Sequence, residues 1–206
     1  MFLRKFALLL ILPLTACLDV VSDVKIGEDE VITADTTMIL GRQLFDMAQA
    51  MGPQAEGLCP ADADRVETPE NVSCKSTEIL TIDEAIAQAK EAKSQDPFLG
   101  EMELVRLDEE RLKLSVPLDF ENIEGKPPEL TSDNPMFALI ADGLAQSEIV
   151  VRLTALEIES SNGAISEDGT TVELVIPTLE ILQPSGTLPE SFEAVVKYRD
   201  CGLLGC

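Results

Sequence analysis

Residues 18–40 read LDVVSDVKIGEDEVITADTTMIL, and this stretch decides the fold. Apolar residues recur at alternate positions on both sides of the acidic segment GEDE at 27–30. A period of two is typical of a half-buried strand, because successive side chains of a strand point to opposite faces. Two such runs that flank a turn containing glycine predict a β-hairpin.

Further runs with the same period follow along the chain. Residues 111–120 alternate most clearly, and Pro117 indicates an edge strand or a strand end because proline lacks an amide donor. Residues 149–158 and 172–176 alternate on the two sides of Asn-Gly and Asp-Gly steps, which are strong hairpin signals. A last strand is predicted over residues 192–198.

Three segments instead carry apolar residues at helical spacing. They are residues 41–51, residues 82–94, and a segment that begins at Pro135. The second follows Thr81-Ile82-Asp83-Glu84, which matches the capping box of a helix start. The predicted fold class is therefore α+β, with a mainly antiparallel sheet of hairpins and about three helices packed on it. A division into two small lobes, with a break near residues 94–100, is also open.

The first residues have a different character. Arg4 and Lys5 precede an apolar run over residues 6–12, which is far shorter than the roughly 20 residues of a membrane span. A basic start, a short apolar run and small residues are the marks of an export signal. The run ends in Leu14-Thr15-Ala16-Cys17, which resembles the lipobox of bacterial lipoproteins.

That resemblance implies a signal peptide over residues 1–16 and a mature envelope domain over residues 17–206. It also implies that Cys17 carries a diacylglycerol and serves as a membrane anchor. Two or three acyl chains hold a protein on a bilayer lastingly, whereas one chain holds it only weakly. Leu18, in place of an aspartate after the lipidated cysteine, favours the periplasmic face of the outer membrane over the inner membrane.

The chain is strongly acidic, with a formal net charge of −23. Removal of residues 1–16, which contain two basic residues and no acid, makes the charge −25. Such a charge repels phosphate backbones, so nucleic acid is excluded as a partner. It also repels anionic lipid head groups, which favours a body that stands off the membrane. A strand that begins at Leu18 leaves little linker after the anchor and therefore favours a body close to the membrane, unless residues 18–22 are loose.

Four cysteines remain after Cys17, and an even number in an exported chain predicts disulfides. Three pairings are open, and proximity in sequence favours Cys59–Cys74 and Cys201–Cys206. A metal site is disfavoured because the chain has no histidine and no close pair of cysteines.

Few residues suit catalysis. Without histidine, the histidine-based triads and metal sites are excluded. No glycine-rich phosphate loop follows a strand, and the chain has no tryptophan and one tyrosine with which to stack a sugar. We therefore expect no enzymatic activity, no cofactor and no bound metal. The alternative is an envelope hydrolase that works through acidic residues or with the help of a metal.

Residues 150–177, VVRLTALEIESSNGAISEDGTTVELVIP, resemble the C-terminal hairpin of LppM-like bacterial lipoproteins. The resemblance implies an envelope α+β domain, with a lipid-contacting role proposed for some relatives and no catalytic residues. Together these patterns predict a non-enzymatic envelope lipoprotein that binds a protein partner or a hydrophobic ligand. Residues on the third predicted helix are the candidates to line such a ligand: Phe137, Ile140 and Leu144.

Overall fold

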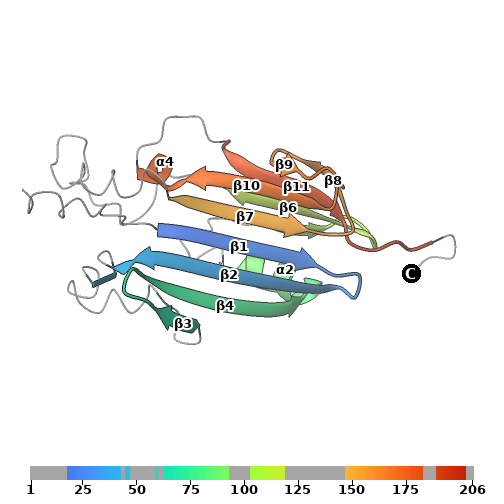
Figure 1. The fold of residues 1–206 in the computed structure, drawn as a ribbon. Coiled ribbons are helices and arrows are strands. Elements are labelled where there is room, and N and C mark those ends of the chain that lie inside the picture. Colours follow the sequence, from blue (N-terminus) through green and yellow to red (C-terminus); the bar gives the residue numbers. More distant parts are fainter. Residues whose placement is uncertain are drawn as a thin grey trace, which may run out of the picture.

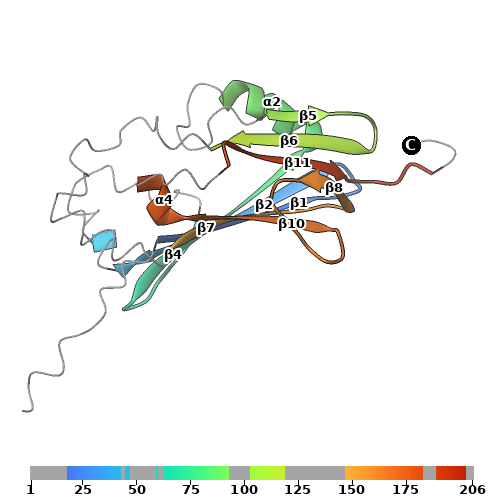
Figure 2. The same ribbon diagram turned by 90° about the horizontal axis from the view of Figure 1, so that it is seen from above.

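The computed structural model describes residues 18–42, 45–46, 59, 63–92, 103–118, 147–182 and 189–202. These residues build two β-sheets that lie face to face (Figures 1 and 2). The seven-stranded sheet has the order β3-β4-β2-β1-β7-β10-β9, and the four-stranded sheet has the order β5-β6-β11-β8.

The seven-stranded sheet consists of β1 (Leu18–Ile26), β2 (Val31–Gly41), β3 (Asp64–Glu67), β4 (Asn71–Thr81), β7 (Glu148–Thr154), β9 (Ala164–Ile165) and β10 (Thr171–Pro177). The four-stranded sheet consists of β5 (Glu103–Arg106), β6 (Arg111–Pro117), β8 (Glu157–Ser161) and β11 (Ser191–Lys197). The helices are α2 (Ile82–Ala92) and α4 (Thr178–Leu182).

The hairpin predicted from residues 18–40 is confirmed. β1 and β2 pair antiparallel from Leu18 opposite Leu40 to Ile26 opposite Ile32. The turn between them closes with the amide of Gly27 donating to the carbonyl of Val31 at 2.8 Å. The alternating residues of both strands therefore share one face of the sheet, as the period of two requires.

β1 also pairs with β7, and this pairing is parallel, with Val20 opposite Ile149 and Lys25 opposite Thr154. The two strands are about 129 residues apart along the chain. Every other pairing among the described strands is antiparallel. β1 thus joins the N-terminal strands to the C-terminal strands in the middle of one sheet (Figure 1).

The predicted α+β class is wrong. The described residues form mostly strands, eleven in number, and two helices, so this part of the protein is a pair of packed sheets. The largest error concerns residues 59–81, where no strand is predicted. Residues 59–74 read CPADADRVETPENVSC, an acidic segment with two prolines that indicates a loop closed by the Cys59–Cys74 disulfide. Residues 59–81 include β3 and β4, and β4 runs over eleven residues. All four side chains of β3 are exposed, so no apolar alternation marks it in the sequence.

The main core lies between the sheets, and α2 closes it along one side. Ile82 and Ala89 of α2 are almost fully buried against the strands, as the predicted stripe requires. The capping box is present, because the Thr81 amide donates to the Glu84 carboxylate at 2.8 Å and the Glu84 amide donates to the Thr81 hydroxyl. The bond from the Thr81 amide lowers the pKa of Glu84.

A second, smaller cluster lies where β1 begins. Leu40, Phe45 and Val72 are buried there, with Leu18 packed against them. The predicted Cys59–Cys74 disulfide is confirmed, with 5.7 Å between the two Cα atoms, and Cys74 is buried in this cluster. The disulfide therefore ties the segment before β3 to the middle of β4.

Several predicted features lie outside the described residues. Among them are the signal peptide, the helix that begins at Pro135 and most of the helix predicted over residues 41–51. The break predicted near residues 94–100 also lies there, so the two-lobe division stays a prediction. None of the described helices is long and apolar enough to span a bilayer.

Loss of the Cys59–Cys74 disulfide should destabilise the protein. The bridge joins residues 15 apart, and a loop of that size contributes about 3 kcal/mol in the chain-entropy treatment. We expect the double substitution Cys59→Ala with Cys74→Ala to lower the free energy of unfolding in urea by about that amount. An unchanged urea midpoint would show that β4 holds its place without the bridge.

Candidate functional site

The residues predicted to carry function are not all described. Cys17, Phe137, Ile140, Leu144 and Cys206 lie outside the described residues, so their roles stay predictions. Cys59 and Cys74 form the disulfide reported above. Cys201 is buried and is also disulfide-bonded, and its predicted partner, Cys206, lies outside the described residues.

The structure gathers charged side chains at one end of the molecule, where β1 turns into β2. Glu30 of this turn accepts hydrogen bonds from Arg106 of β5, at 3.3 Å and 3.4 Å. Arg199, just after β11, forms an ion pair with Glu30 at 2.8 Å. Arg106 also donates to Asp83 of α2 at 3.1 Å. With the tyrosine described next, we call this group the interlock: Glu30, Asp83, Arg106, Tyr198 and Arg199.

Tyr198 lies at the centre of the interlock. Its side chain is fully buried, and burial raises the pKa of its phenol. The phenol oxygen accepts a hydrogen bond from Arg106 at 2.8 Å and donates one to the carbonyl of Glu109 at 2.7 Å. The guanidinium groups of Arg106 and Arg199 lie 5.9 Å and 5.5 Å from the centre of its ring. Arg106 bonds the Tyr198 phenol, Glu30 and Asp83, so the interlock joins both sheets and α2.

Glu30 has a backbone conformation that few residues adopt, with φ at 63°. For a residue other than glycine, this left-handed conformation costs about 1 kcal/mol or more. The carboxylate gains the bonds to Arg106 and Arg199, and the Glu30 carbonyl accepts the first amide of α2, that of Ile82, at 2.9 Å. These contacts offset the strain and explain why glutamate occupies this position.

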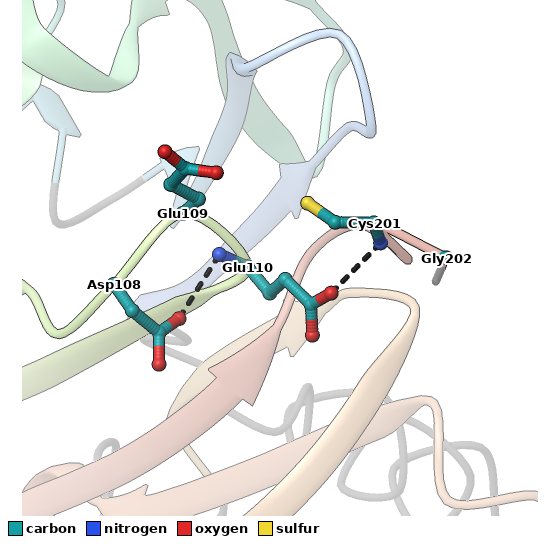
Figure 3. Close-up of a pocket in the computed structure, with 5 residues that line it drawn as sticks. All are labelled: Asp108, Glu109, Glu110, Cys201 and Gly202. Atoms are coloured by element: carbon teal, nitrogen blue, oxygen red, sulfur yellow. Dashed lines mark hydrogen bonds between the residues drawn. The ribbon is translucent and has the colours of Figure 1, made fainter. Parts of the chain in front are cut away.

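A hollow of about 400 Å³ lies beside the interlock (Figure 3). Its walls come from the turn between β5 and β6 and from the segment after β11. Five residues line it: Asp108, Glu109, Glu110, Cys201 and Gly202. Three acids in one hollow are the arrangement that the alternative hydrolase would need, so the environment of each acid matters.

Two of the three acids have partners within the fold. Asp108 accepts the amides of Glu110 and Arg111 and pairs with the Arg111 guanidinium at 2.6 Å, and this guanidinium lowers the pKa of Asp108. Glu110 accepts the amide of Cys201 at 2.8 Å and pairs with Lys197 at 3.6 Å.

The Glu109 carboxylate is exposed and points away from the other two acids (Figure 3). The hollow thus presents one open carboxylate, while its other acids fix the turn and hold the end of β11. No group of three or more histidine, cysteine, aspartate or glutamate side chains suited to a metal ion occurs in the described part of the chain.

Sequence reasoning did not find the interlock. Its members come from the segments GEDE, IDEAIA, LVRLDEE and VVKYRDC, which lie far apart along the chain. The one usable signal is Tyr198, because it is the only tyrosine of the chain and follows an alternating strand. A buried phenol needs a polar partner, but nothing in the sequence identifies that partner as Arg106.

Removal of the Tyr198 hydroxyl should weaken the fold without changing its shape. Tyr198→Phe leaves the buried ring and deletes the bonds to Arg106 and to the Glu109 carbonyl. We expect the free energy of unfolding to fall by about 2 kcal/mol, because one of the lost bonds involves a charged group. Thr77→Val is the control, since the Thr77 hydroxyl also donates to a charged group, the Asp35 carboxylate, but at the exposed surface, and the expected change is below about 0.5 kcal/mol. Equal effects of the two substitutions would contradict a central role for the phenol.

Comparison with known proteins bears on the fold. No family model and no curated protein matches the sequence. The NMR structure of the folded domain of LppM from Mycobacterium tuberculosis is similar, with a TM-score of 0.51. The match covers 90% of this chain and 92% of that domain, at 12% sequence identity. At this identity the similarity shows the fold alone, and it agrees with the likeness to LppM-like proteins seen in residues 150–177.

Proposed function

We propose that the protein is a membrane-anchored bacterial envelope lipoprotein that binds a protein partner or a hydrophobic ligand and catalyses no reaction. The observation that carries the proposal is the lipobox-like segment Leu14-Thr15-Ala16-Cys17, placed directly before the first strand. The signal peptide of this proposal comprises residues 1–16, and the anchor is a lipid on Cys17. The fold similarity to the LppM domain supports an envelope role, because LppM belongs to a group of bacterial lipoproteins.

The start of the folded domain also fits this proposal. Leu18, the residue after Cys17, is part of β1 and packs against the second core cluster. The strong negative charge favours a partner with a basic or apolar surface over a nucleic acid.

The proposal of a binding role without catalysis rests on the acids of the hollow. Asp108 and Glu110 are engaged by Arg111, Lys197 and the amide of Cys201. A general acid and base need carboxyl groups with separated pKa values and access to the substrate. Ion pairing instead keeps the pKa of Asp108 low and holds its carboxylate in the turn.

The anchor is tested by substitution of Cys17. We expect Cys17→Ser to prevent lipid attachment and to leave the protein either unprocessed or released from membranes. Mass spectrometry of the N-terminal peptide and membrane flotation measure the two effects. Thr15→Ser keeps a small hydroxyl residue before the cysteine and is expected to preserve both lipid and flotation. Flotation of Cys17→Ser equal to that of the unchanged protein would rule out this anchor.

The nature of the bound partner is tested on the mature protein extracted from membranes in mild detergent. Native mass spectrometry of a carrier of hydrophobic ligands is expected to show an excess mass that matches a lipid, beyond the lipid on Cys17. A mass that corresponds to the lipidated chain with two disulfides favours a protein partner. Crosslinking in intact envelopes then identifies that partner, and failure of both measurements would contradict a binding role.

A further inference from the structure

The start of β1 leaves almost no flexible linker between Cys17 and the folded sheet. The Leu18 amide donates to the Ser147 hydroxyl at 2.9 Å, and the Leu18 carbonyl accepts the Thr178 hydroxyl at 3.5 Å. Leu18 also lies opposite Leu40 in the sheet. Consecutive Cα atoms are about 3.8 Å apart, so a lipid on Cys17 is separated from the folded sheet by one peptide unit. Residues 18–22 are part of a strand, which removes the loose tether that the sequence left open.

One end of the seven-stranded sheet therefore lies at the bilayer if Cys17 is lipidated. The register places the start of β1 beside the end of β2 and the starts of β4 and β7, and β10 ends there and leads into α4. We call this the anchor end, marked by Leu18, Gly41, Asn71, Glu148 and Pro177.

The turn between β1 and β2 lies at the opposite end, with the interlock and the hollow (Figures 1 and 2). We call it the turn end, marked by residues 27–30 and 107–110. β1 spans nine residues between the two ends, which corresponds to about 27 Å at roughly 3.4 Å per residue.

A tether at one point does not by itself choose between an upright and a flat orientation. Electrostatics makes that choice. The outward face of the seven-stranded sheet carries the row Asp35, Asp23, Arg152 and Glu173, in which one arginine pairs with two of three acids. Along this face there are more acids than bases, with Asp19 and Glu148 added at the anchor end and Lys25 and Lys75 nearby. An anionic bilayer repels acids that lie within about 10 Å of it. A flat orientation brings the whole row within that distance, whereas an end-on orientation brings, of the acids named, Asp19 and Glu148, so lying flat is unfavourable.

We propose that the protein stands end-on on the bilayer, with the anchor end at the lipid head groups and the turn end facing away from them. The hollow and the open Glu109 carboxylate are then presented at the far end of the molecule, about 30 Å from the bilayer. This orientation rests on the proposed lipid anchor and adds to it which surface meets the membrane and which surface is free for a partner.

Two exposed glutamates offer a matched test of orientation. Glu70 precedes β4 at the anchor end, and Glu28 lies in the β1–β2 turn. No side-chain partner of either is seen in the described residues. In two separate variants, a small fluorescent non-natural amino acid replaces one of them in the full-length lipoprotein. Each purified variant is reconstituted in vesicles of phosphatidylcholine and phosphatidylglycerol that contain a lipid with a spin label on its head group, which quenches fluorescence at short range.

We expect quenching at position 70 to exceed quenching at position 28 several-fold. Vesicles without the spin label are the control for both variants. Equal quenching at the two positions shows a flat orientation and overturns the proposal. No quenching at either position, on protein that floats with the vesicles, shows a loose tether and overturns it as well. The intact mass is measured first, because a chain without lipid overturns the proposed function and the orientation with it.

Discussion

Six residues of β1, from Val20 to Lys25, pair in parallel with β7, and this ladder holds the two halves of the seven-stranded sheet together. On one side of it lie β2, β4 and β3, and on the other side lie β10 and β9. A parallel pair cannot be joined by a tight turn, so the chain must travel away and return. β5 and β6 lie between β1 and β7 along the chain, and they belong to the four-stranded sheet. The segment that connects the two parallel strands therefore supplies part of the opposite sheet.

The packing between the sheets and the interlock at their turn end serve different purposes. Burial of apolar side chains such as Leu112, Leu153 and Phe192 supplies the main stabilisation, since burying one such side chain contributes about 2 kcal/mol. Ion pairs near the surface contribute much less, typically below about 1 kcal/mol each. The interlock instead fixes how the two sheets lie relative to each other. Arg106 can bond both Glu30 and Tyr198 in one relative position of the sheets only.

The two ends of the molecule differ, and in the proposed function one end is held at the membrane while the other is free for a partner. At the anchor end, Leu18, Phe45 and the Cys59–Cys74 disulfide make a small apolar cluster directly after the proposed lipid site. At the turn end, three acids of the β5–β6 turn line a hollow together with Cys201 and Gly202, and the Glu109 carboxylate is open. A protein held at the anchor end presents the hollow and the Glu109 carboxylate at the other end, which suits contact with a partner away from the membrane.

The sequence by itself determined the local elements whose causes are local. Alternation predicted β1, β2, β6, β10 and β11, the capping box predicted the start of α2, and cysteine spacing predicted Cys59–Cys74. Strand β4 was not predicted because its second half, residues 75–81, has no buried side chain, so apolar and polar residues do not alternate there. Only the tertiary structure decided the fold class, the β1–β7 pairing and the interlock. Each depends on contacts between segments far apart along the chain, and periodicity identifies which face of a strand is buried but not what covers it.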